Sequence, residues 1–305
     1  ILTKMSEYHN PVLLNDSVDA LIIDASGIYV DCTFGGGGHS REIVKRLDQN
    51  GKLFSFDQDV DAIRNKIDDP RFELVEQNFR FLKNNLRIRG IKQVDGVLGD
   101  LGVSSHQFDT PERGFSTRFD GELDMRMNQN AKLSAKTIIN EYEEADLARI
   151  FYDYGELSGS YRLAKEVVKA RTEKQIETID ELKQIFSFIP KMKENKFFAQ
   201  MFQALRIEVN DEMAALKDML MQCTDVIKPG GRLVIISYHS LEDRLTKRFM
   251  KNGMFEGEPE RDVYGNWSAP FKPLQSKVIV PTQEEINENP RARSAKMRIA
   301  VRNEE

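Results

Sequence analysis

Short apolar runs alternate with amphipathic stretches over the first hundred residues. Apolar, often β-branched runs predict strands at 27–34, 52–57, 72–79 and 94–101. Helical spacing of apolar residues predicts helices between them, at 43–47, at 60–67 and in the basic segment that follows residue 79. Strands separated by helices indicate an α/β fold with a parallel, doubly wound sheet.

This alternation stops near residue 105. Residues 109–130 form a polar stretch longer than ordinary connections, and such stretches are either functional or disordered. Helical patterns follow, with Ser134 as a helix cap and a capping box formed by Thr178 and Glu181. We interpret residues 105–205 as an inserted helical subdomain.

The strand and helix pattern resumes after residue 205. A long amphipathic helix is expected at 202–227, a buried strand at 232–238, and a helix capped by Ser240 with Asp243. Segments 277–280 and 295–301 are expected to form a closing hairpin. Residues 1–104 and 206–305 are thus the two parts of one α/β domain, interrupted by residues 105–205.

Composition excludes several protein classes. The 305 residues have a net charge of −5, so contact with nucleic acid must use local basic patches. No apolar run approaches the roughly 18 residues of a membrane span, and the first residues lack a secretory signal pattern. Only two cysteines occur, far apart, which disfavours disulfides and a cysteine zinc site and favours the cytoplasm.

A glycine turn after the first strand predicts a ligand site. Asp31, Gly35 and Gly37 lie where the carboxyl edge of a sheet meets a helix N-terminus. Asp57 closes the second strand, where acidic side chains bind ribose hydroxyls in nucleotide-binding sheets. The alternative is that the glycines only form a tight turn and bind no ligand. The strand that precedes them and the presence of Asp57 make this alternative less favoured.

The ligand follows by elimination. Ser40 stands where the dinucleotide pattern GxGxxG requires glycine, and the phosphate-binding pattern GxxxxGK[ST] is absent. An acidic residue four positions before GxG, here Asp31, is the usual mark of an S-adenosylmethionine site. Asp100 ends the fourth strand and is the candidate catalytic residue, while His239 and Ser240 end the next strand and are substrate-binding candidates. His39 and His239 are too isolated to support a metal site.

Taken together, the motifs resemble those of the bacterial 16S ribosomal RNA cytosine-N4 methyltransferases, the RsmH or MraW family. The resemblance covers nearly the whole chain. Its motifs are HNPVLL at 9–14, DCTFGGGGHS at 31–40, DLGVSS at 100–105, RGFS at 113–116, LDMRM at 123–127, FQALRI at 202–207, HSLEDR at 239–244 and NPRARS at 289–294.

The resemblance implies a class I S-adenosylmethionine-dependent methyltransferase with an inserted helical substrate-recognition domain. It implies N4-methylation of cytosine 1402 (standard rRNA numbering) of 16S rRNA in the small ribosomal subunit. Carried over by motif, the cofactor contacts are Gly37, Gly38, His39, Asp57, Phe79, Asp100 and Gln107. The oligomeric state stays open, with a homodimer as one alternative.

Cytosine's exocyclic amine is a poor nucleophile, so orientation and an acceptor for its proton are the expected contributions to catalysis. Asp100 is the first candidate for that acceptor, although holding the cofactor is an alternative role. Lys83, Arg87 and Arg89 belong to a basic island with no acidic residue between 77 and 94. They are candidates for RNA phosphate contacts, and a solvated helix face is the equally weighted alternative.

Two rival functions remain at this point. The first is a non-catalytic RNA-binding or ribosome-assembly factor that retains the methyltransferase fold, against which the intact glycine and acidic positions count. The second is a nicotinamide-dependent oxidoreductase, which Ser40 disfavours.

Overall fold

The computed structural model describes residues 11–304 and divides the chain into two compact units. The first unit comprises Ile1–Gly102 and Ala214–Glu305, and the second comprises Val103–Met213. The second boundary lies after residue 213 rather than 205 because a long helix continues to Asn210. Of the sequence motifs, only His9 and Asn10 lie outside the described residues.

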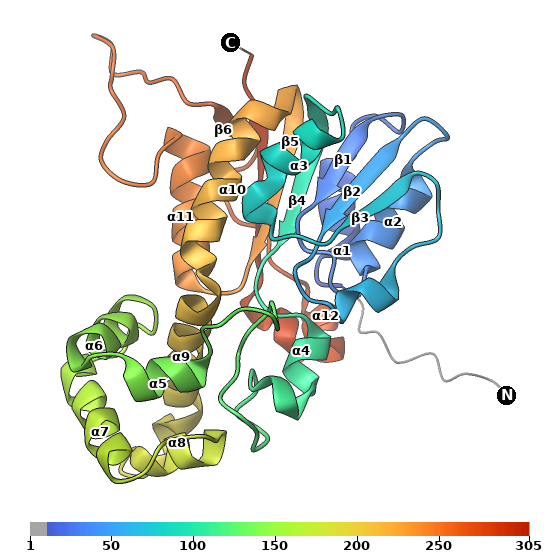
Figure 1. The fold of residues 1–305 in the computed structure, drawn as a ribbon. Coiled ribbons are helices and arrows are strands. Elements are labelled where there is room, and N and C mark those ends of the chain that lie inside the picture. The colour runs from blue at the N-terminus through green and yellow to red at the C-terminus, as the bar shows by residue number, and fades with distance from the viewer. Residues whose placement is uncertain (1–10, 305) are drawn as a thin grey trace, which may run out of the picture. The chain divides into compact units, whose positions relative to one another are not determined.

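A seven-stranded sheet forms the first unit, in the order β3-β2-β1-β4-β5-β7-β6 (Figure 1). β1 to β5 pair in parallel, while β7 is antiparallel to both β5 and β6. The strands are β1 (Ile28–Asp31), β2 (Lys52–Phe56), β3 (Phe72–Val75), β4 (Val94–Asp100), β5 (Ile227–Ser237), β6 (Phe271–Pro273) and β7 (Lys296–Arg302). The predicted class I methyltransferase fold is confirmed.

Helices cover both faces of this sheet. α1 (Leu14–Leu21) and α2 (Gly38–Arg46) bury Val18 and Ile43 in one apolar cluster. On the opposite face, Leu86, Met219 and Phe249 share a second cluster. They belong to α3 (Leu82–Ile88), α10 (Glu212–Val226) and α11 (Ser240–Asn252). The short helix α12 (Gln283–Glu288) precedes β7. The sheet therefore lies between two apolar layers, with its strand ends free to form a site.

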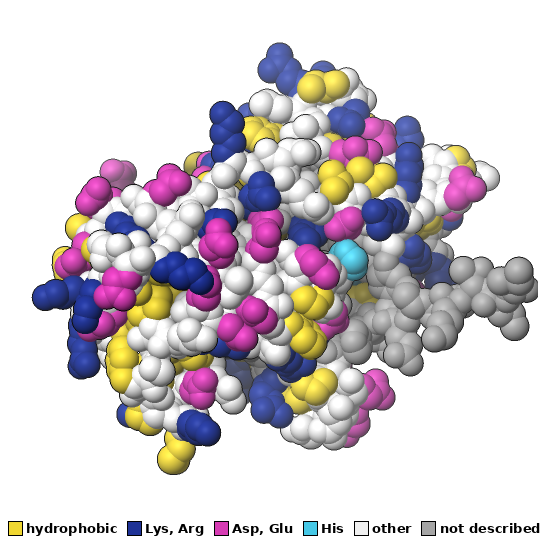
Figure 2. All heavy atoms as spheres, turned by 60° about the horizontal axis from the view of Figure 1, so that its bottom comes forward, with side chains coloured by type: hydrophobic (Ala, Val, Ile, Leu, Met, Phe, Trp, Pro, Cys, Tyr) yellow, Lys and Arg dark blue, Asp and Glu magenta, His cyan; other side chains and the backbone are white. Residues whose placement is uncertain are grey.

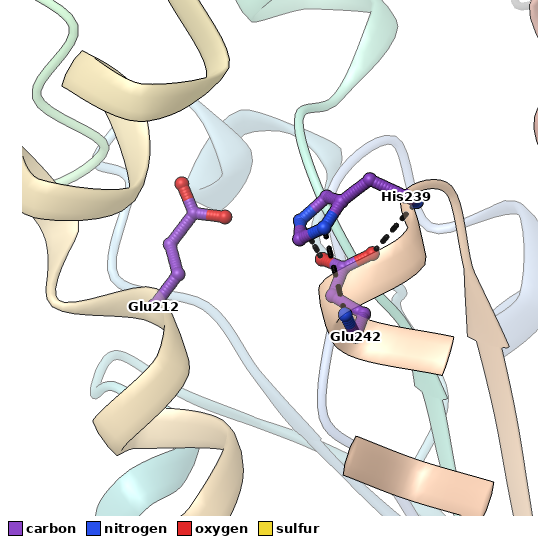
Figure 3. Close-up of side chains that lie close together, drawn as sticks. All are labelled: Glu212, His239 and Glu242. Atoms are coloured by element: carbon purple, nitrogen blue, oxygen red, sulfur yellow. Dashed lines mark hydrogen bonds and ion pairs between the residues drawn. The ribbon is translucent and has the colours of Figure 1, made fainter. Parts of the chain in front are cut away.

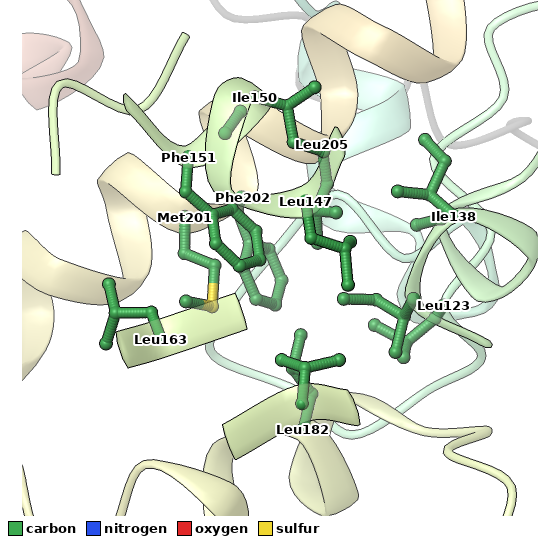
Figure 4. Packing of buried hydrophobic residues seen from close by; sticks show 14 of the residues in the cluster. Leu123, Ile138, Leu147, Ile150, Phe151, Leu163, Leu182, Met201, Phe202 and Leu205 are labelled. Carbon is green, nitrogen blue, oxygen red and sulfur yellow. The ribbon is translucent and has the colours of Figure 1, made fainter. Parts of the chain in front are cut away.

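The second unit is helical and has a core of its own, drawn in Figure 4. Its helices are α4 (Ser105–Asp109), α5 (Ala135–Glu141), α6 (Glu144–Asp153), α7 (Ser160–Glu173), α8 (Ile179–Ile185) and α9 (Lys191–Asn210). The predicted cap at Ser134 and the capping box of Thr178 are both confirmed. The polar stretch 109–130 is structured, because Phe115 and Leu123 are buried in this core.

Several predicted elements differ from the structure. The helix expected at 60–67 is one 3₁₀ turn (Ala62–Asn65), since the Asn65 side chain is drawn toward the glycine turn and donates to the carbonyl of Gly35. The helix expected at 202–227 breaks at Asp211, whose φ of 49° is left-handed. The strand expected at 72–79 ends at Val75.

The predicted closing hairpin is confirmed in part. Ile279 and Met297 form an antiparallel bridge, but residues 300–302 of β7 pair with β6, a strand that was not predicted. The physical reason is burial: Phe271 of β6 is 1% exposed and packs against Phe249, whereas Val280 is 57% exposed. Within residues 11–304, no helix combines the length and apolar character needed to cross a membrane.

Candidate active site at the carboxyl edge of the sheet

Three aspartates meet at one edge of the first unit. Asp31 ends β1, Asp57 follows β2 directly and Asp100 ends β4. Because β2, β1 and β4 are neighbours and parallel, their carboxyl ends place the three carboxylates side by side. The sequence predicted this grouping from strand ends alone.

Asp31 organises the turn that follows it. One carboxylate oxygen accepts two hydrogen bonds from Thr33, from its backbone N–H and, at 3.3 Å, from its hydroxyl. The other oxygen accepts a hydrogen bond from the Ser40 hydroxyl at 2.6 Å. The Ser40 and Ser55 hydroxyls lie 2.8 Å apart. Ser40 therefore replaces the third glycine of a dinucleotide site with a side chain that ties α2 to the strand ends.

The glycine turn needs glycine for two reasons. Gly37 has a φ of 77°, and a Cβ there would lie 2.7 Å from a guanidinium nitrogen of Arg41. A Cβ on Gly38 would lie 2.1 Å from the ring of Pro11. Gly37 is also the N-cap of α2 and supplies no side-chain cap, so the first N–H groups of this helix can bind a carboxylate.

Asp57 braces the turn from the neighbouring strand. Its carboxylate accepts hydrogen bonds from the backbone N–H of Gly35 at 2.7 Å and of Asp59 at 2.8 Å. Burial raises the pKa of Asp57 from 3.8 to about 6. Phe79, half-buried, begins the 3₁₀ turn after β3 and packs against the apolar cluster beneath the sheet.

Asp100 lies in a network of three elements. It accepts a 2.8 Å hydrogen bond from the Tyr238 hydroxyl, and its other oxygen lies 3.7 Å from Nδ1 of His39. Its backbone N–H donates to the Thr33 hydroxyl at 2.7 Å. Burial raises the pKa of Asp100 to about 6, while His39 and the Tyr238 hydrogen bond lower it. His39 is 5% exposed, and its Nε2 lies 3.2 Å from the carbonyl of Val12.

Tyr238 is the site residue that sequence reasoning missed. It follows β5 directly, so it shares the carboxyl edge with Asp100 on the neighbouring strand. Gly102 lies beside the tyrosine ring and has a φ of 95°, a left-handed conformation that favours glycine. The available signal was the place of Tyr238 at a strand end, where His239 and Ser240 had already been selected.

His239 and Ser240 lie at the start of α11, and His239 rather than Ser240 is its N-cap. The predicted cap was wrong because the pair that closes this helix end is His239 with Glu242. Figure 3 shows the two side chains together, with Nε2 of His239 3.2 Å from Glu242. Glu242 also accepts from the backbone N–H of Tyr238 at 2.9 Å. This capping network fixes the chain just after β5.

Gln107 lies on α4, in the helical unit. It is buried, and its side chain accepts a hydrogen bond from the backbone N–H of Ser104 at 3.0 Å, completing a capping box. Its assignment to the cofactor, like that of Gly37, Gly38, His39, Asp57, Phe79 and Asp100, stays a prediction.

The basic island is largely ion-paired within the first unit. Lys83 contacts Asp225 at 2.7 Å and Arg89 contacts Glu73 at 2.6 Å. A helix between parallel strands runs opposite to them, so Arg87 and Arg89 lie toward the amino edge of the sheet, away from Asp100. The ion pair of Arg89 and the position of both residues toward the amino edge favour the solvated-face interpretation of Arg87 and Arg89. On the face drawn in Figure 2, positive and negative side chains are interspersed.

The site fits S-adenosylmethionine better than a pyrophosphate. Three neighbouring carboxylates repel phosphate groups, but they attract a ligand that has a positive sulfur and a protonated amine. Asp57, the predicted ribose contact, offers carboxylate oxygens, and the uncapped start of α2 suits a carboxylate.

Sequence comparisons find similar proteins along nearly the whole chain. The chain is 62% identical over 300 residues to "Ribosomal RNA small subunit methyltransferase H" of Flavobacterium johnsoniae, covering 98% of this chain and 99% of the relative. Proteins of the same name from Christiangramia forsetii and Bacteroides fragilis are 59% and 58% identical, covering 97% and 96% of this chain and 98% and 97% of the relatives.

Among solved structures, a putative rRNA methylase from Clostridium thermocellum superposes with a TM-score of 0.44 at 11% identity, covering 97% of this chain and 98% of that one. Aeropyrum pernix fibrillarin with bound S-adenosylmethionine superposes with a TM-score of 0.40 at 9% identity, and the match covers 94% of this chain and 74% of that one. The family described as "MraW methylase family" matches residues 6–303. The chain belongs to the MraW methylase family.

Proposed function

We propose that this protein methylates the exocyclic N4 of cytosine 1402 in 16S rRNA of the small ribosomal subunit. The relatives that support this proposal are named as small-subunit rRNA methyltransferases and match along almost the whole chain. S-adenosylmethionine, the cofactor predicted from the sequence, is the methyl donor of the family. An rRNA target implies action in the cytoplasm.

The observation that supports amine methylation best is the environment of Asp100. Its carboxylate ends β4 at the sheet edge and has a hydroxyl donor, Tyr238, on one oxygen only. The second oxygen lies 3.7 Å from His39, beyond ordinary hydrogen-bond length, and so can accept another donor. A cytosine amine presents such a donor.

Each part of the site has a distinct task in this proposal. S-adenosylmethionine supplies a methyl group on a positively charged sulfur, which keeps the bonding electron pair when the methyl group leaves. The start of α2 holds the carboxylate of this ligand, and Asp57 holds its ribose hydroxyls. Asp100 accepts a hydrogen bond from the N4 amine, orients its lone pair toward the methyl group, and takes the proton that N4 releases as the new N–C bond forms.

Proton acceptance at this position contributes about 10²-fold to 10⁴-fold to the rate, and orientation contributes more. A pKa near 6 suits the task, because Asp100 is ionised at neutral pH and is still a stronger base than an ordinary aspartate. The helical unit, residues 103–213, is proposed to recognise the RNA around the target base.

Nucleoside analysis tests the proposal. Small subunits lacking the modification are incubated with the protein and S-adenosylmethionine, and the 16S rRNA is digested and analysed by mass spectrometry. N4-methylcytidine at position 1402 is expected, and Asp100→Asn serves as the matched variant, with a severe loss of rate. A different methylated nucleoside would refute the N4 assignment, and RNA binding without any methylation would favour the non-catalytic assembly factor.

A further inference from the structure

A second hollow lies in the first unit, beside β7. β6 pairs with residues 300–302 of β7, the backbone N–H of Leu274 donates to the carbonyl of Ile299, and Ile279 bridges Met297, so residues 275–278 form a loop between these contacts. This leaves a cavity of about 400 Å³ beneath the loop, lined by α11, β7 and the loop itself. Its size lies within the range typical of small-ligand sites and is sufficient for one nucleotide.

The polar lining of this cavity is cationic. Lys247, Lys251, Lys277 and Arg298 line it, and none of the described residues that line it is acidic. Two of the four are held in place: Arg298 is paired with Asp243 at 2.7 Å, and the Lys251 ammonium lies 5.8 Å from the centre of the Trp267 ring.

The other two cations are exposed. Among residues 11–304, Lys247 and Lys277 have no carboxylate partner within ion-pair distance. Their charges are available to an external anion, unlike that of Lys83, which is paired with Asp225.

Apolar residues also line the cavity: Met250 of α11, Met297 and Ile299 of β7, and Ile279. Met250 and Met297 are each 1% exposed and Ile299 is 8% exposed, so the cavity offers a ligand mainly the surface of its cations. Such a lining suits an anion, such as a phosphate group of a nucleotide. The larger hollow nearby, of about 1000 Å³, is different because Glu260, Asp262 and Glu304 line it.

Strand register relates the cavity to the reacting edge. Asp100 pairs with Ile236 of β5, and Ile236 pairs with Met297. Two strand spacings of about 4.8 Å separate Asp100 from Met297 at the backbone. The backbone of Met297, which lines the cavity, therefore lies about 10 Å from that of Asp100.

We propose that this cavity binds a nucleotide of the substrate RNA that flanks the target cytosine, with Lys247 and Lys277 on its phosphate. The inference rests on the proposed function, because it takes the ligand to be the RNA that is methylated. It also explains how a chain with a net charge of −5 binds RNA: through a local cluster of cations.

The test compares two double variants in the full-length protein. Lys247→Gln with Lys277→Gln removes the exposed cations of the cavity. Arg87→Gln with Lys92→Gln is the matched control, because both residues are exposed and belong to the basic island away from the cavity. Binding to a 16S rRNA fragment containing the target loop is measured by fluorescence anisotropy across a range of salt concentrations.

The cavity variant is expected to bind about tenfold more weakly at 0.1 M salt, with a salt slope shallower by about 0.7, since both lysines are proposed to contact one phosphate and each phosphate contact to single-stranded RNA contributes about 0.7. The control is expected to keep the wild-type slope, and both variants are expected to keep wild-type affinity for S-adenosylmethionine. Equal slopes for the cavity variant and wild type would overturn the inference.

Two further outcomes separate this inference from the proposed function. Weaker binding of the cavity variant to assembled subunits, with unchanged binding to the naked fragment, would overturn the RNA assignment in favour of an acidic ribosomal protein surface. A changed salt slope in a protein that methylates no cytosine would uphold the cavity and refute the proposed function.

Discussion

Replacement of Tyr238 by phenylalanine probes the ionisation of Asp100 without removing its carboxylate. The substitution deletes one hydroxyl, which donates a 2.8 Å hydrogen bond to Asp100. The other charged groups facing Asp100 are unchanged: His39 from α2, Asp31 from β1 and Glu242 from α11. Any change in the pH dependence of methyl transfer is therefore assigned to the lost hydrogen bond.

The magnitude follows from the strength of that bond. A hydrogen bond to a charged acceptor contributes about 1.5 to 3 kcal/mol, and one pKa unit corresponds to about 1.4 kcal/mol. Because the Tyr238 hydrogen bond lowers the pKa of Asp100, its loss raises that pKa by about 1 to 2 units. Methyl transfer requires the ionised carboxylate, so activity falls as pH drops through the pKa, and this fall shifts to higher pH by the same amount.

The assay is single-turnover methyl transfer from labelled S-adenosylmethionine, with cofactor and RNA saturating, from pH 5 to 9. Tyr29→Phe is the control, since the Tyr29 hydroxyl is also hydrogen-bonded but accepts from the backbone N–H groups of Ile23 and Asp24, which precede β1 and lie away from the carboxyl edge. We expect the Tyr238→Phe profile to shift upward and the control profile to match wild type. Identical profiles for Tyr238→Phe and wild type would refute the role of Asp100 as proton acceptor.

Three further predictions follow from the same edge of the sheet. Asp57→Ala is expected to weaken S-adenosylmethionine binding by about 1.5 to 3 kcal/mol in calorimetric titration, because it removes an ionised acceptor; unchanged affinity in a folded variant would exclude Asp57 from the site. Gly38→Ala is expected to lower both cofactor affinity and melting temperature, because the added Cβ overlaps the ring of Pro11. A variant equal to wild type in both quantities would show that the backbone of the turn shifts at little cost in free energy. Asp100→Asn is expected to stabilise the cofactor-free protein by about 1 to 3 kcal/mol at pH 7.5. Folding raises the pKa of Asp100 to about 6, so the ionised carboxylate destabilises the folded state once the pH exceeds 6, whereas the protonated carboxyl below pH 4 does not. Asparagine stays neutral and removes this cost. Thermal melts at pH 7.5 and pH 4.5 check this last prediction, and a variant less stable than wild type at pH 7.5 would contradict it.

The residues that the sequence located correctly are those whose positions depend on local pattern. Asp31, Asp57 and Asp100 each follow an apolar run, and the parallel arrangement of those runs follows from the helices between them. The caps at Ser134 and Thr178 are equally local, because each bonds to a backbone N–H three residues away.

The features that the sequence did not reveal depend on long-range packing. Lys83 pairs with Asp225, 142 residues away, so the basic island could not be recognised as ion-paired from its own composition. The choice of β6 over 277–280 as partner for β7 depends on the burial of Phe271 against α11. Tyr238 was missed because only the adjacency of β4 and β5 shows that its hydroxyl meets Asp100.

The most direct test of the account is a complementation measurement in bacteria that lack their own gene for this methyltransferase. This chain or its Asp100→Asn variant is expressed, and the 16S rRNA fragment containing cytosine 1402 is analysed by mass spectrometry. The account predicts N4-methylation of that cytosine with the wild-type chain and at most a trace with the variant, at equal protein levels. Full methylation by Asp100→Asn, or none by the wild-type chain, would contradict it.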